Sequence, residues 1–183
     1  MMKKDITNAK LLSGWTLTLT EGSTLPQDVA TAFYDLYEKF GAMYKPVYYV
    51  GHQLVNGTNH KIIAERNRLI SGGAMIREFA VITINIPIGS VGGKGATKVS
   101  ENDSTNFILR DEIEKGIKIA IGKENGINYK PILELGTQGK EDVTEYVFIC
   151  ESTIADNAAA SYLTCVTISN QNDDWNIVEI ERL

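Results

Sequence analysis

The chain has 183 residues, of which 43% are hydrophobic and 22% charged, so it resembles folded globular proteins rather than disordered or collagen-like ones. Its 18 Lys and Arg residues against 23 Asp and Glu leave a net charge of -5, which offers no basic surface for a phosphate backbone. We therefore expect no nucleic-acid partner. No apolar run approaches the roughly 18 residues that cross a bilayer, and no hydrophobic signal core follows the N-terminus. A cytoplasmic protein without a membrane partner is expected.

An internal repeat organises the sequence. Tyr44-Lys45-Pro46, followed by Gly51 and Gln53, recurs as Tyr129-Lys130-Pro131, followed by Gly136 and Gln138. This spacing indicates a duplicated unit of about 85 residues, with chance similarity of strand-rich segments as the alternative. We expect one unit at residues 1–89 and a second, degenerate unit at 104–183. Between them, residues 90–103 form either a Gly-rich linker or an edge strand.

In the first unit, a strand over 15–20 precedes an amphipathic helix. Thr24 and Pro26 mark the start of this helix, Val29, Phe33 and Tyr37 recur at helical spacing, and Gly41 ends it. Alternating β-branched and aromatic residues then predict strands over 47–55, 58–66 and 79–86.

The second unit repeats the pattern. Ser104 or Thr105 caps a helix that ends near Gly122, and strands are predicted over 132–138, 144–151, 162–169 and 175–181. The expected fold class is therefore α+β, with two tandem units that each pack a helix on an antiparallel sheet.

The glycines of residues 89–95 invite comparison with a phosphate-binding loop. Such a loop requires a Gly that is separated by four residues from its Gly-Lys pair, and Ser or Thr after the pair, but Ile88 and Gly95 occupy these positions. No cofactor is expected here, and the segment is better interpreted as a linker.

The Asn56-Gly57 pair predicts a two-residue hairpin turn. That turn pairs Val55 with Thr58 and places His52 opposite Lys61, so the chain's two histidines should lie on opposite faces of the sheet. They could then share no metal ion, and no familiar metal-ligand spacing occurs elsewhere. Cys150 and Cys165 are too few for a disulfide framework, and we expect free thiols.

Catalytic signatures are missing from the sequence. It contains no Gly-x-Ser-x-Gly or His-Glu-x-x-His motif, and a Cys-His dyad would need residues from different repeats. The chain is not expected to be an enzyme. An enzyme on the same scaffold would need a pocket with a polar group between helix and sheet.

The segment Gln53-Leu54-Val55-Asn56-Gly57-Thr58-Asn59 resembles the Gln-x-Val-x-Gly hairpin of the cystatin family, and of its stefin branch in particular. Leu11-Leu12-Ser13-Gly14 resembles the family's N-terminal trunk, and Pro87 stands where its second binding hairpin carries a proline. The resemblance implies a cystatin-like fold and inhibition of papain-like cysteine proteases by occlusion of the active-site cleft. The implied protease-binding residues are Gly14, Gln53, Leu54, Val55, Asn56, Gly57 and Pro87.

In the second unit the corresponding stretch, Gln138-Gly139-Lys140-Glu141-Asp142, is charged and would be costly to bury in a cleft. Inhibition is therefore not expected of it. The alternative function is a tandem cystatin-like interaction or structural module without a protease target.

Overall fold

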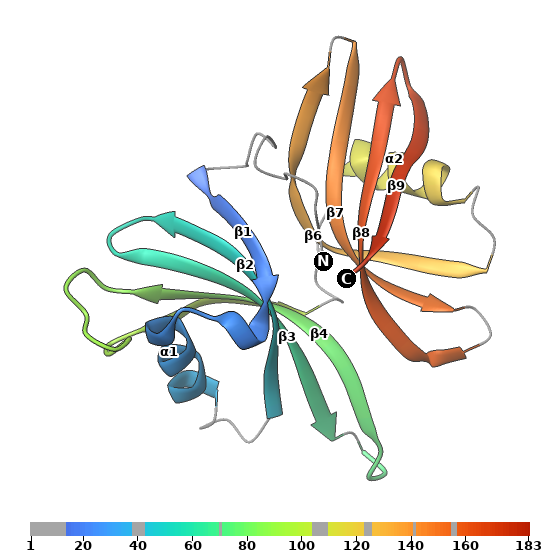
Figure 1. Cartoon of the computed structure of the whole chain (residues 1–183). Helices are drawn as coiled ribbons and strands as arrows, with labels where there is room; N and C mark the ends of the chain where they lie inside the picture. The colour runs from blue at the N-terminus through green and yellow to red at the C-terminus, as the bar shows by residue number, and fades with distance from the viewer. Residues whose placement is uncertain are drawn as a thin grey trace. The chain divides into compact units, whose positions relative to one another are not determined.

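The structure is a computed structural model, which describes residues 14–37, 43–69, 71–103, 110–122, 126–140, 142–154 and 157–183. The described chain divides into two compact units, residues 14–103 and 110–183 (Figure 1). Each unit is built on one antiparallel sheet.

The first unit contains a five-stranded sheet in the order β1-β2-β3-β4-β5. Its elements are β1 (Thr16–Glu21), a short 3-10 helix (Gly22–Thr24), α1 (Gln27–Tyr37), β2 (Met43–Leu54), β3 (Thr58–Leu69), β4 (Met75–Ile86) and β5 (Thr97–Asp103). Because consecutive strands are neighbours, every connection in this sheet is local.

The register between β3 and β4 is unbroken from Thr58↔Ile86 to Leu69↔Met75. Side chains alternate between the two faces of a strand, so Ile62 and Ala64 share one face with Ala80, Ile82 and Ile84. All five are fully buried in the core beneath α1. These five side chains form the apolar stripe of this sheet.

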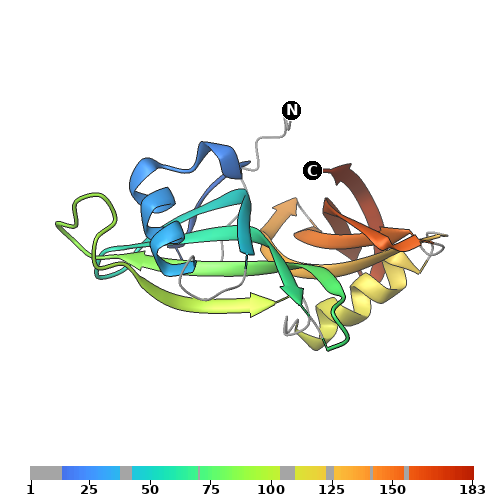
Figure 2. The ribbon, with the colours of Figure 1, turned by 90° about the horizontal axis from the view of Figure 1, so that it is seen from below.

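Helix α1 covers this face of the sheet (Figure 2). Val29, Ala32, Phe33 and Tyr37 are buried along one stripe of the helix, as the helical spacing predicts. Each of the larger apolar side chains stabilises the fold by about 1.5–3 kcal/mol when it is buried. This gain offsets the cost of ordering the 11-residue helix.

The second unit contains a four-stranded sheet in the order β6-β7-β8-β9. Its elements are α2 (Asp111–Ile121), β6 (Ile127–Lys140), β7 (Val143–Ile154), β8 (Asn157–Gln171) and β9 (Asp174–Arg182). Ile113, Ile117 and Ala120 of α2 are buried against Phe148 and Trp175. The residues expected to cap this helix, Ser104 and Thr105, lie outside the described residues.

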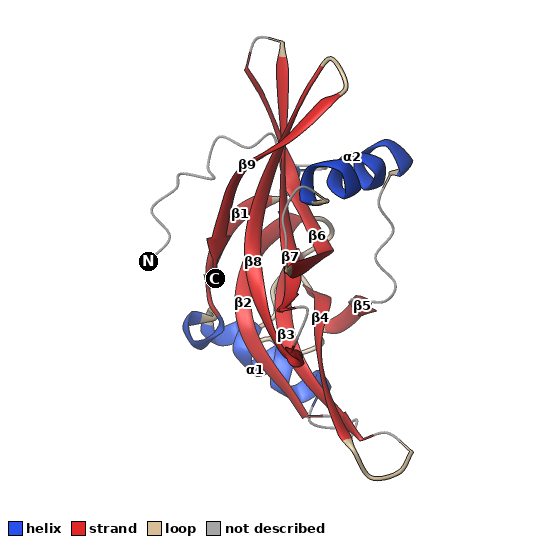
Figure 3. Ribbon diagram, turned by 90° about the vertical axis from the view of Figure 1, so that its right-hand side faces the viewer, coloured by secondary structure: helices blue, strands red, loops and turns tan. Residues whose placement is uncertain are grey.

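The expected α+β fold class is wrong, because the molecule is mostly β, with two antiparallel sheets and two short helices in the described chain (Figure 3). The sequence signal underestimates the strands, since pairing continues beyond the alternating segments on which the prediction rested. Strands β2, β3, β4 and β7 each run for 12 residues, and β8 for 15. In addition, residues 97–103 form β5 at the edge of the first sheet, so they belong to the first unit.

Candidate functional site

Three segments of the first unit meet at one end of its sheet. The pair Thr58↔Ile86 places Pro87 beside the β2–β3 turn, and the pair Thr16↔His52 places the start of β1 at the same end. Gly14, two residues before Thr16, is exposed there. We refer to Gly14, residues 54–57 and residues 87–88 together as the rim. The trunk residues 11–13 lie outside the described residues.

Gly57 is packed tightly within the rim. Its φ is +119°, and a Cβ on it would lie 2.4 Å from the carbonyl oxygen of Ile86 and 3.1 Å from Cα of Pro87. Only glycine combines this backbone conformation with so close an approach. Gly57 therefore holds the turn against the end of β4, which makes a substitution at this position a poor probe of binding.

A chain of side-chain amides braces the turn from behind. Asn59 Nδ2 lies 3.4 Å from Gln53 Oε1, Asn85 Nδ2 donates to Asn59 Oδ1 at 2.8 Å, and the same Asn85 group donates to the carbonyl oxygen of Val55 at 3.3 Å. These residues come from β2, β3 and β4. Gln53, a residue of the predicted site, thus takes part in supporting the rim.

The exposed surface of the rim is apolar and carries no ionisable side chain. Leu54 is 79% exposed and Ile88 is 85% exposed, while Val55, Asn56 and Pro87 are also exposed. The sequence prediction of the binding residues did not include Ile88. Its position directly after Pro87 was the signal that could have identified it. Large apolar side chains that remain in water at one end of a sheet are typical of a protein-binding surface.

The loop after Pro87 is folded against helix α1 rather than acting as a linker between units. Ser90 Oγ donates to the carbonyl oxygen of Lys94 at 2.6 Å, and the backbone nitrogen of Ser90 donates to the carbonyl oxygen of Pro87 at 3.2 Å. Gly93 is buried, and a Cβ on it would lie 2.3 Å from the carbonyl oxygen of Asp28. Residues 89–96 therefore connect β4 to β5 within one sheet. Of the two alternatives for residues 90–103, a Gly-rich linker or an edge strand, the structure has an edge strand at 97–103.

The two histidines lie on the same face of the sheet, contrary to the sequence prediction. The β2–β3 connection contains three residues, so Leu54 pairs with Thr58 and His52 pairs with His60. A register change of one residue moves a side chain to the opposite face of a strand, which explains the error. The ring centroids of His52 and His60 are 6.4 Å apart.

His60 is 8% exposed, and its Nδ1 lies 2.9 Å from the hydroxyl oxygen of Tyr49. Burial lowers the pKa of His60; the charge of His52 acts in the same direction, and that of Asp28 acts against it. Burial also raises the pKa of Tyr49 to about 12, so its hydroxyl stays protonated at neutral pH. The pair is therefore a neutral hydrogen-bonded unit under the rim.

A charged network lies at the other end of the sheet. Arg66 forms ion pairs with Glu78 at 2.5 Å and with Glu101 at 3.2 Å, and Tyr44 donates to Glu101 at 2.5 Å. Hydrogen bonds from Arg66 and Arg68 lower the pKa of Glu78 although burial acts in the opposite direction. The network joins β2, β3, β4 and β5, and each carboxylate in it has a cationic partner.

The equivalent end of the second sheet differs from the rim. Asp142, between β6 and β7, is exposed, and the β8–β9 turn presents Asp173 and Asp174, also exposed. The side chains of Gln138, Lys140 and Glu141, which belong to the charged stretch predicted there, lie outside the described residues. Cys150 and Cys165 are buried in this unit, and neither is part of a disulfide.

The described residues contain no cluster of three or more His, Cys, Asp or Glu side chains suited to a metal ion. No helix among them has both the length and the apolar character required to span a bilayer. Comparisons with protein families, curated proteins and solved structures find no significant match to the chain.

Proposed function

We propose that the first unit binds another protein through the rim, and that this partner is a papain-like cysteine protease whose active-site cleft the rim occludes. The observation that carries the proposal is the position of Leu54 and Ile88, both largely exposed, on two adjacent segments at one end of the sheet. The choice of a papain-like protease as the partner is based on the resemblance of residues 53–59 to the cystatin hairpin.

The composition of the rim suits insertion into a narrow groove. Leu54, Val55, Pro87 and Ile88 present apolar surface, and Asn56 is the one polar side chain at the tip. Since no ion has to lose its hydration, the desolvation cost that a charged loop would carry is avoided. A standard interface covers about 800 Å² per partner, which needs several adjoining segments rather than a single turn.

The rim is also held in one conformation before it meets a partner. Asn85 bonds both the Asn59 side chain and the Val55 carbonyl, and Gly57 is lodged against Ile86. A segment that is already ordered loses less conformational entropy on binding, so more of its contact energy appears as affinity.

The test is titration of papain with the protein while hydrolysis of a small fluorogenic substrate is followed. Wild-type protein should inhibit, and Leu54→Glu should weaken inhibition at least about tenfold, because a carboxylate would be buried without a partner in the cleft. The matched control is Leu69→Glu, since Leu69 is 66% exposed at the other end of the same strand pair.

Leu69→Glu should inhibit like the wild type. Equal inhibition by the Leu54 and Leu69 variants would contradict the rim as the contact surface. Absence of inhibition by folded wild-type protein would remove the protease as partner.

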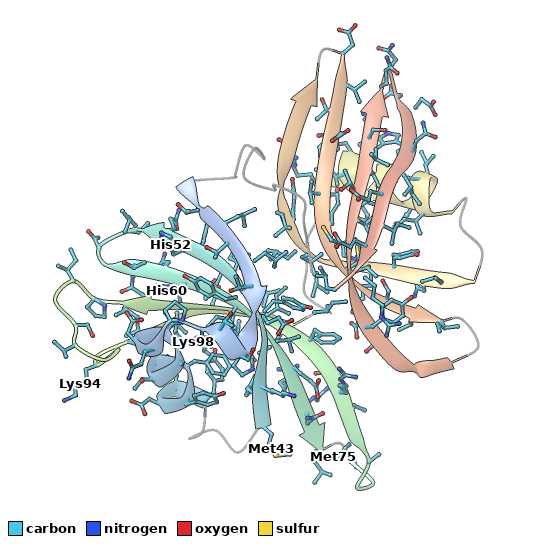
Figure 4. The ribbon with its side chains drawn as sticks, in the orientation of Figure 1. Met43, His52, His60, Met75, Lys94 and Lys98 are labelled. Atoms are coloured by element: carbon cyan, nitrogen blue, oxygen red, sulfur yellow. The ribbon has the colours of Figure 1, made fainter. Side chains whose placement is uncertain are left out.

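A second candidate function is a non-inhibitory interaction module. The observation that favours it is another exposed apolar group, Met43, Leu69 and Met75, at the end of the sheet remote from the rim (Figure 4). Occlusion of a protease cleft by the rim makes no use of these side chains. This alternative predicts that folded wild-type protein leaves papain fully active.

A further inference from the structure

The two histidines of the chain form a facing pair on adjacent strands. His52 and His60 are direct partners in the β2–β3 ladder, and their ring centroids are 6.4 Å apart with the ring planes inclined at 38° (Figure 4). Two imidazoles that bind one ion with metal–nitrogen bonds near 2 Å have centroids about 5 Å apart. A movement of about 1 Å by one ring closes that difference, which is within the reach of a side-chain rotation.

The surroundings divide the pair into a fixed ring and an accessible ring. His60 is buried, and one of its two nitrogens, Nδ1, is bonded to the Tyr49 hydroxyl at 2.9 Å. A hydrogen bond of this kind at the second ring nitrogen is the usual way in which proteins orient a metal-binding histidine. His52 is half-buried, so it remains accessible from solvent and is free to adjust.

The charge state also suits an ion. Imidazole binds metals in its neutral form, and burial lowers the pKa of His60, which keeps this ring neutral at pH 7. The negative charge of Asp28, in the first turn of α1, stabilises positive charge at His60, which also favours a bound cation there. The lysine next in sequence, Lys61, belongs to the other face, where its ammonium lies 4.4 Å from the ring centroid of Trp15.

We propose that His52 and His60 together bind one divalent transition-metal ion of the class that imidazole prefers, namely Zn²⁺, Ni²⁺ or Cu²⁺, with water in the remaining positions. The described residues offer no third side chain of the usual ligand types, so the site is an exchangeable one rather than a closed structural centre. The bound ion links β2 to β3 just behind the turn at residues 55–57.

The first experiment uses the wild-type protein and its two imidazole signals, observed by long-range ¹H–¹⁵N NMR during titration with ZnCl₂. Both imidazoles should shift together and saturate at one equivalent of zinc. MgCl₂ should leave both unchanged, because magnesium prefers oxygen ligands. A response of one histidine alone, or the same response to magnesium, would overturn the proposal.

The second experiment measures Zn²⁺ affinity by calorimetry on variants. His52→Ala should reduce the affinity at least about tenfold, and Tyr49→Phe should reduce it through loss of the partner that orients His60. Asp173→Asn/Asp174→Asn, in the acidic turn of the second unit, is the control for non-specific cation binding and should bind zinc like the wild type.

His60→Gln is measured by the same calorimetry if circular dichroism shows that this variant folds. If the variant does not fold, the NMR titration of the wild type tests whether His60 binds zinc. Unchanged zinc affinity in His52→Ala would overturn the proposal. None of these measurements involves a protease, so they stand or fall independently of the function proposed for the rim.

Discussion

The side chain of Asn85 donates through Nδ2 to Asn59 Oδ1 at 2.8 Å, and through the same group to the carbonyl oxygen of Val55 at 3.3 Å. A side-chain amide carries two hydrogens on its nitrogen, so one group can make both bonds at once. The end of β4 is thereby tied to the turn between β2 and β3. This connection helps to hold the rim in its shape.

Asn85→Ala should lower the free energy of unfolding by about 1 kcal/mol, since it removes partly exposed hydrogen bonds. Its larger effect should be local, with faster hydrogen exchange of the amides at residues 55–58. The control is Asn67→Ala, which removes a 3.4 Å contact with Glu65 at the far end of β3. Equal exchange at residues 55–58 in both variants would argue against the bracing role of Asn85.

Gly57→Ala should destabilise the protein by about 2 kcal/mol or more, because the new Cβ meets the Ile86 carbonyl in addition to forcing an unfavourable φ. Gly72→Ala separates these two effects, since Gly72 also has a positive φ, +98°, but nothing within 4 Å of its Cβ position. Urea denaturation should therefore give a distinctly smaller loss for Gly72→Ala, about 1 kcal/mol. Similar losses for both would mean that the contact with Ile86 relaxes freely.

Two buried tyrosines should respond differently to loss of the hydroxyl. Tyr49→Phe should lower the free energy of unfolding by about 1–3 kcal/mol, because it leaves His60 Nδ1 buried without its partner. The Tyr37 hydroxyl is buried with no hydrogen-bond partner among the described residues. Tyr37→Phe should accordingly be neutral or stabilising in thermal denaturation. A larger loss for Tyr37→Phe than for Tyr49→Phe would contradict these hydrogen-bond assignments.

Stability should depend on pH through His60. Its pKa in the folded protein lies below the value of 6.5 that it has when unfolded, so the unfolded chain binds the proton more readily. The contribution of the neutral ring is complete above pH 6.5 and is lost as the pH falls from there through the folded pKa. Urea denaturation between pH 7.5 and 5 should show this decline, and it should be smaller in a folded His60→Gln variant. An unchanged slope in that variant would assign the decline to other groups.

Much of the secondary structure could be predicted from local pattern. The helical spacing of Val29, Phe33 and Tyr37 and the alternation of Ala80, Ile82 and Ile84 identify the residues that the first core buries. Both patterns follow from the geometry of a single helix or strand, so they are visible in the sequence. The position of the β2–β3 turn follows in the same way from Asn56 and Gly57, both of which adopt positive φ.

Only the tertiary structure decided the lengths of the strands, and therefore that the molecule is mostly β. It also decided that residues 97–103 pair with β4. A one-residue difference from the predicted register brings His52 opposite His60. These features depend on hydrogen bonds between different strands, which the pattern within a single segment does not encode. The rim is of the same kind: Gly14, Gly57 and Pro87 come together because antiparallel pairing returns three separate segments to one end of the sheet.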